Sequence, residues 1–206
     1  MKRCVFILML MVVDCVCAWD SVSEMETDFC LALTNGDYLL SAAFSNQLSS
    51  ATNLTSAESR SEVFMLSAIH AAQNFEVTDD ERWIQEEMKM ASNAVVVIGM
   101  QANKWQYWMS RFVYAGAYAS QSDYGKALFV MTNSLSEISV SDCTNDVSPV
   151  CRAMLRKFEM PDIGVFEALK VMAGMSAASI GERIIATNFA NQVVAPYRSI
   201  ILEFAQ

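Results

Sequence analysis

The chain has 206 residues, 53% of them hydrophobic, and its formal net charge at pH 7 is −9. This length is enough for one sizeable hydrophobic core. The acidic balance repels phosphate backbones and anionic lipid surfaces, so we expect no nucleic-acid partner and no membrane-surface partner.

Residues 1–18 have the pattern of a secretory signal peptide. Lys2 and Arg3 precede an apolar run over residues 4–13, and small residues follow up to Ala18. The apolar run is too short for a membrane anchor, which takes about 20 residues. We expect cleavage after Ala18, with Val16 three residues before the cut, and a secreted, extracellular mature protein without a membrane segment.

Three cysteines, Cys30, Cys143 and Cys151, remain after that cleavage. An oxidising compartment favours disulfides, and the odd number leaves one thiol over. Cys143 and Cys151 flank a turn into a helix that starts near Pro149, so we expect them to form the disulfide. Cys30 is then free and buried, or paired between chains. Zinc is disfavoured because the sole histidine, His70, is distant in sequence and no Cys-x-x-Cys motif occurs.

A polar loop carries an Asn-Leu-Thr glycosylation sequon at Asn53. We expect Asn53 to carry a glycan. The alternative is an unoccupied sequon, because Thr55 can also cap the helix that follows.

Apolar residues recur with helical spacing throughout, and no proline occurs between residues 22 and 148. Strands are not needed to explain any segment. A capping box of Thr78 and Glu81 predicts a central helix over residues 78–100, and Ser122 predicts the start of a later one. Pro196 predicts a break between helices over residues 182–194 and 197–204.

These patterns predict an all-α, secreted helical bundle of about seven or eight helices. We expect residues 19–140 to form a five-helix bundle domain and residues 141–206 to add helices that pack on it. Aromatic residues at helical spacing, among them Trp105, Trp108 and Phe112, form either a ligand-binding face or part of the core. The core is favoured, because the spacing is that of one buried helix face.

No catalytic, cofactor-binding or metal-binding constellation is recognisable in the sequence. The motifs of serine hydrolases, zinc proteases and nucleotide-binding loops do not occur. An ordinary helix residue is favoured for His70 over a catalytic base. Glu86 and Glu87 are adjacent on a helix and so do not face each other, which favours a solvated helix face over an acid–base pair. We expect a protein that is not an enzyme.

Several segments resemble the N-terminal domain of spider silk proteins (spidroins). They are FSNQLSS at residues 44–50, NLTSAE at 53–58, the helix opening at 78–92 and AGAYASQSDYGKALFVMTNSL at 115–135, while residues 165–181 look like that domain's third helix again. The resemblance covers residues 25–138. It implies a secreted, acidic, methionine-rich bundle of five helices that self-associates.

Spidroin N-terminal domains sense pH through acidic residues in their second, third and fifth helices. The corresponding positions here hold Glu62, Val97 and Ala127, so only the first keeps an acidic side chain. The resemblance therefore implies that Glu62 is the pH-responsive residue, and that the response is gradual rather than a sharp switch.

We expect a non-enzymatic structural or assembly protein, such as a silk component, that acts through self-association of helix faces. Its partners are then other copies of itself or related structural proteins. The alternative is a secreted carrier that binds a small apolar ligand between its helices. Of the 14 methionines, eleven remain after the expected cleavage, and they indicate either a plastic helical core or a bundle that changes partner or conformation, because methionine fills irregular interiors and forms interfaces that can repack.

Overall fold

The computed structural model describes residues 57–99, 104–137, 155, 158–160 and 162–205. This part of the chain is 83% helical, with seven helices and no strands, which confirms the predicted all-α bundle. Some predictions fall outside the described residues. They are the signal peptide at residues 1–18, the glycan at Asn53, the Cys143–Cys151 disulfide, the state of Cys30 and the domain boundary at residue 140.

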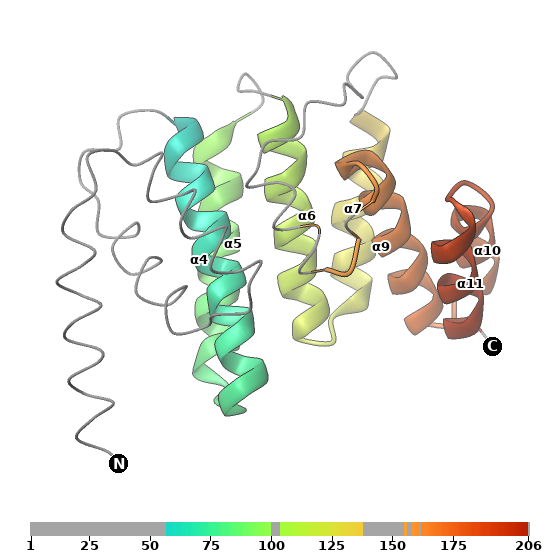
Figure 1. Ribbon diagram of the computed structural model, residues 1–206, viewed down its shortest axis with the longest axis horizontal. Helices are drawn as coiled ribbons and strands as arrows, with labels where there is room; N and C mark the ends of the chain where they lie inside the picture. Colours follow the sequence, from blue (N-terminus) through green and yellow to red (C-terminus); the bar gives the residue numbers. More distant parts are fainter. Residues whose placement is uncertain (1–56, 100–103, 138–154, 156–157, 161, 206) are drawn as a thin grey trace, which may run out of the picture.

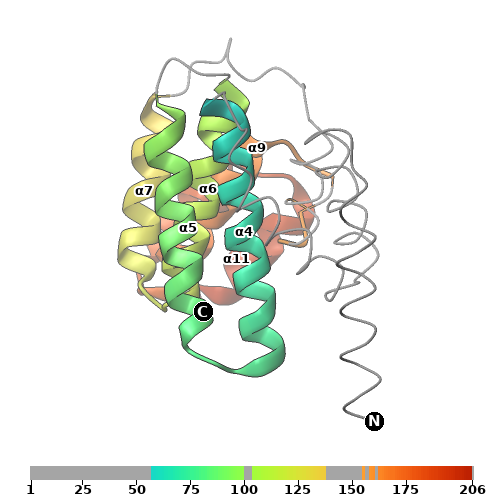
Figure 2. The same ribbon diagram turned by 90° about the vertical axis from the view of Figure 1, so that its left-hand side faces the viewer.

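The described helices follow one another across the molecule, from α4 and α5 at one end to α10 and α11 at the other (Figure 1). Each packs against the next one along the chain, and α9 also packs against α6. Seen from the first end, α4 and α5 lie in front and α11 lies behind (Figure 2). Their bounds are α4 (Ala57–Thr78), α5 (Arg82–Ile98), α6 (Lys104–Ser120), α7 (Tyr124–Glu137), α9 (Val165–Ser179), α10 (Arg183–Ala190) and α11 (Ala195–Phe204).

One hydrophobic core extends from Val63 on α4 to Ile201 on α11. Helix α6 lies in its middle, where Trp108 and Phe112 are buried, so the prediction that this aromatic face belongs to the core is confirmed. Helix α9 is buried along most of its length, since it packs between α7 on one side and α10 and α11 on the other. The segment after residue 164 therefore shares the core of the preceding helices.

The predicted capping box of Thr78 and Glu81 is wrong. Thr78 is the last residue of α4, and its hydroxyl donates to the carbonyl of Asn74 (2.6 Å). The chain reverses at Asp79, whose φ is +54°, and α5 begins at Arg82. The side chain of Asp80 accepts a hydrogen bond from the Arg82 backbone N–H (3.1 Å) instead.

Two other predicted helix boundaries also differ. Ser122 does not cap α7: it has a φ of +60°, and the carboxylate of Asp123 accepts the Lys126 backbone N–H (3.2 Å). Helix α10 ends at Ala190, four residues earlier than predicted. Pro196 lies in the first turn of α11, where its missing N–H costs no helical hydrogen bond, so it starts that helix.

Candidate functional sites: a polar pocket and an apolar terminal surface

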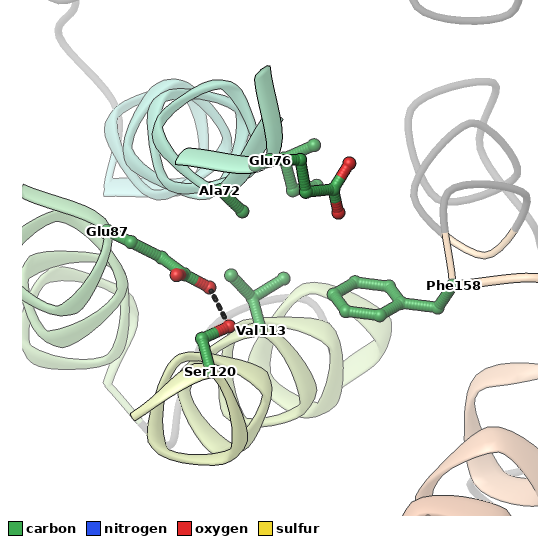
Figure 3. A pocket seen from close by; sticks show the side chains of 7 residues that line it. Ala72, Glu76, Glu87, Val113, Ser120 and Phe158 are labelled. Atoms are coloured by element: carbon green, nitrogen blue, oxygen red, sulfur yellow. Dashed lines mark hydrogen bonds between the residues drawn. The ribbon is translucent and has the colours of Figure 1, made fainter. Parts of the chain in front are cut away.

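A small pocket lies between α4, α5 and α6, beside the turn that carries Phe158 (Figure 3). Its volume is about 100 Å³. The ring of Phe158 forms one wall, because it packs edge-on against Phe112 (4.8 Å between ring centroids) and over Gly116, which has no side chain to displace it. The residues that line the pocket are Ile69, Ala72, Glu76, Glu87, Val113, Ser120 and Phe158.

The solvated face predicted for Glu86 and Glu87 is wrong for Glu87. Glu86 is partly exposed and pairs with Lys89 (3.3 Å), but Glu87 is buried, with 4% of its surface exposed. Its carboxylate accepts a hydrogen bond from the hydroxyl of Ser120 on α6 (3.1 Å), as Figure 3 shows. The same hydroxyl also contacts the carbonyl of Gly116 (3.2 Å). Glu87 therefore links α5 to α6 from inside the pocket.

His70 is buried in α4 as an ordinary helix residue. Asn74 donates from Nδ2 to its Nε2 (2.6 Å), and its ring packs edge-on against Trp83 of α5 (5.8 Å between centroids). Burial lowers the pKa of His70 to about 4, because the apolar surroundings disfavour the charged ring. The imidazole is therefore neutral at physiological pH, and its contacts serve the packing of α4 on α5.

Glu62, the residue that the spidroin resemblance marks as pH-responsive, lies half-buried on α4. Its Oε1 accepts a hydrogen bond from Nε2 of the buried Gln106 on α6 (2.5 Å). This contact joins α4 to α6. Its role in a pH response stays a prediction.

Within the described residues, no group of three or more His, Cys, Asp or Glu side chains could hold a metal ion. None of the helices in that part of the chain combines the length and the apolar character that a bilayer crossing requires.

Exposed apolar side chains gather at the far end of the row of helices. Ten large apolar residues of the described chain are exposed, and seven of them lie within residues 180–204. Ile184 is 78% exposed and Phe204 is 56% exposed, values that normally belong to polar side chains. We call this region the apolar terminal surface: Ile180, Ile184, Ile185, Val194, Ile200, Leu202 and Phe204.

The apolar terminal surface arises because α10 and α11 hold more apolar residues than one helix face can bury. Helix α10 turns Ala186 and Ala190 inward, which leaves the neighbouring Ile184 and Ile185 outside. In α11, Ile200 and Leu202 flank the fully buried Ile201. The three consecutive apolar residues at 200–202 were a signal in the sequence, since an amphipathic helix does not bury three in a row.

A scan against protein-family models, a search of curated proteins and a search of solved structures each found no match to this chain.

Proposed function

We propose that this protein is a secreted, non-enzymatic structural or assembly protein, such as a silk component, that acts through self-association of its helix faces. The observation that carries the proposal is the apolar terminal surface, where seven large apolar side chains remain exposed at one end of the row of helices. Large areas of exposed apolar side chains mark interaction sites, because covering them with a partner removes apolar area from water.

The pocket beside Glu87 gives less support to the alternative, a carrier of a small apolar ligand. Drug-sized ligands occupy pockets of roughly 300–1,000 Å³ that are lined mainly by apolar groups. The pocket here measures about 100 Å³, and two carboxylates and a hydroxyl line it. Glu87 and Ser120 in its lining hydrogen-bond to each other across α5 and α6, and a polar lining of this kind does not favour an apolar ligand.

Sedimentation velocity of the purified full-length mature chain over a range of concentrations tests the proposal. We expect the mean mass to rise with concentration from that of a monomer. A terminal triple variant carries Ile184→Gln, Val194→Gln and Phe204→Gln, and we expect it to remain monomeric because the apolar area that drives association is lost.

A control triple variant separates this surface from exposed apolar residues in general. It carries Val77→Gln, Val96→Gln and Phe129→Gln, three side chains that are at least as exposed on average but lie on α4, α5 and α7. We expect it to associate like the wild type. A wild-type chain that stays monomeric at every concentration would contradict the proposed function.

A further inference from the structure

Two tyrosines of α6 hold their phenol rings against each other. Tyr114 and Tyr118 are four residues apart, so they lie on one face of the helix, about one turn from each other. One hydroxyl donates to the other (2.8 Å), and the ring centroids are 4.9 Å apart with 55° between the ring planes. The hydroxyl ends are closer together than the ring centres, so the rings converge toward the carbons that bear the hydroxyls.

Neighbouring helices hold this pair in place and leave part of it exposed. Lys126 of α7 lies over the ring of Tyr118 (5.4 Å from Nζ to the ring centroid), and Ser92 of α5 hydrogen-bonds to Tyr114. Both tyrosines pack against the hydrophobic core and keep part of their surface exposed. Within the described residues, no other two tyrosine rings contact each other. The pair is therefore a preformed contact between two phenols that a small oxidant can reach.

The hydroxyl contact also bears on how an electron can leave the pair. Burial, and next the hydrogen bond with Tyr118, raise the pKa of Tyr114 to about 12, so this phenol keeps its proton at physiological pH. A protonated phenol loses an electron readily only when its proton can leave at the same time. The hydrogen bond between the two hydroxyls gives that proton an acceptor, which favours one-electron oxidation at this place in the helix.

We propose that Tyr114 and Tyr118 form a cross-linking site, at which a haem peroxidase with hydrogen peroxide joins the two side chains of one chain as dityrosine. Each phenol gives up one electron and one proton, and hydrogen peroxide takes up two of each to become two molecules of water. The two phenoxyl radicals couple between a Cε atom of Tyr114 and a Cε atom of Tyr118. The hydrogen on each coupled carbon then moves to the oxygen of its ring, which restores both hydroxyls.

The arrangement of the pair resembles that of the product. In dityrosine the new bond lies beside both hydroxyls, which stay within hydrogen-bond distance of each other on rings that are twisted out of one plane. Tyr114 and Tyr118 already have the hydroxyl contact and the twist between their rings. Little motion is needed before the radicals couple, so coupling within the chain is faster than coupling between chains that must meet by diffusion.

Limited oxidation of the purified full-length mature chain by a haem peroxidase and hydrogen peroxide tests the site. Wild type should gain dityrosine fluorescence and still run as a single chain on a denaturing gel. Trypsin cuts after Arg111 and Lys126, and the peptide between these cuts should be lighter by two hydrogen atoms. Fragmentation of that peptide in the mass spectrometer should map the link to Tyr114 and Tyr118.

Two variants and a denaturant separate the pair from tyrosines in general. Tyr118→Phe removes one phenol and keeps the ring, so the yield of the cross-link should fall at least about tenfold. Tyr124→Phe removes the other tyrosine of the same peptide and should leave the yield unchanged. Circular dichroism should show both variants as helical as wild type. Oxidation of wild type in urea should give a lower yield, because the rings are no longer held together.

Several results would overturn the inference. They are a cross-link that survives Tyr118→Phe, one that is lost in Tyr124→Phe, and one that joins separate chains. Oxidation of methionine and tryptophan without any dityrosine in the folded wild type would do the same, and equal yields in urea and in buffer would show that the fold does not position the pair. These outcomes are independent of association through the apolar terminal surface, so the proposed function is tested separately.

Discussion

Glu87 and Glu86 are chemically identical neighbours, and their surroundings give them different roles. Glu87 points between α5 and α6 and bonds Ser120, while Glu86 pairs with Lys89 at the surface. Removing a hydrogen-bonded side chain from the interior leaves its partner without a hydrogen bond. A surface ion pair such as that of Glu86 with Lys89 contributes little to the free energy of unfolding.

We therefore expect Glu87→Ala to lower the free energy of unfolding by about 1–3 kcal/mol, and the matched control Glu86→Ala to change it by less than about 0.5 kcal/mol. Urea denaturation followed by circular dichroism measures both. Equal losses in the two variants would show that Glu87 does not hold α5 to α6.

His70 provides a pH dependence that is free of other imidazoles, because it is the sole histidine in the chain. Its pKa in the folded protein is about 4, below the ordinary value of 6.5, so the unfolded chain binds a proton first as the pH falls. The contribution of His70 to the free energy of unfolding is fully present above pH 6.5 and is lost as the pH falls toward 4.

We expect the free energy of unfolding to fall by about 2 kcal/mol as the pH is lowered from 8 to 5, because His70 binds a proton more readily in the unfolded chain. Urea denaturation of the wild type at the two pH values includes the carboxylates as well, so the same experiment on His70→Gln supplies the baseline. The difference between the two chains isolates the imidazole. A wild type and a variant with the same pH slope would mean that His70 titrates normally in the folded protein.

At the scale of single elements, α7 is capped by Asp123 and not by Ser122, the residue that the sequence predicted. The Asp123 carboxylate accepts the Lys126 backbone N–H, and Ser122 adopts a left-handed conformation that suits glycine. The pKa of Asp123 is lowered by its hydrogen bond and ion pair with Lys126.

We expect Asp123→Ala to lower the melting temperature, because it removes the cap of α7, and Ser122→Gly to leave it unchanged or slightly higher. Asp123→Asn keeps an acceptor for the backbone N–H and should retain most of the stability. Thermal unfolding measures all three. A larger loss from Ser122→Gly than from Asp123→Ala would restore Ser122 as the cap.

The contact between α9 and α11 depends on the missing side chain of Gly174. Ile201, which faces it, is fully buried, and its β-branched side chain has few alternative rotamers. A methyl group at 174 would lie 2.7 Å from Cδ1 of Ile201 and 3.1 Å from both its Cγ1 and Cγ2, so the helices must move apart.

We expect Gly174→Ala to destabilise the protein by about 1–3 kcal/mol, although alanine is the better helix former. Gly125→Ala, at an exposed position of α7 where the added Cβ would make only an ordinary contact with Oδ1 of Asp123 (3.9 Å), should instead stabilise by up to about 1 kcal/mol. Adding Ile201→Val to Gly174→Ala removes the closest methyl group and should recover part of the loss. A stabilising Gly174→Ala would mean that α9 and α11 lie farther apart than the structure places them.

At the scale of the whole molecule, the distribution of charge sets how association responds to pH. Residues 180–206 contain two glutamates and no histidine. The excess acid lies elsewhere in the chain, where its repulsion acts over distance and is screened by salt.

We therefore expect self-association to strengthen gradually, by less than about tenfold in Kd, between pH 7.5 and pH 5.5, and this effect to shrink further in 0.5 M salt. Sedimentation equilibrium at the two pH values and two salt concentrations measures it. A steep, salt-independent step would instead assign the response to a specific half-buried group such as Glu62.

The sequence by itself determined the class of fold and the buried aromatic face of α6. Helical periodicity is a local property, and the aromatic face around Trp108 and Phe112 has the spacing of a buried stripe in any bundle. Periodicity, cap signals and Pro196 also located the helices predicted over residues 78–100, 182–194 and 197–204 to within about four residues at each end. Which cap residue was used, however, depended on the turn geometry at Asp79 and Ser122, where several neighbouring side chains had the right chemistry.

The tertiary structure alone decided the burial of Glu87 and the exposure of Ile184 and Phe204. A carboxylate is buried or solvated according to whether another helix crosses over it, and α6 crosses at Glu87 with Ser120 in place to bond it. An apolar side chain is covered only if the fold supplies a further helix, and the described row ends at α10 and α11. The candidate interaction surface exists because burial depends on neighbours that are distant in sequence, which no local pattern encodes.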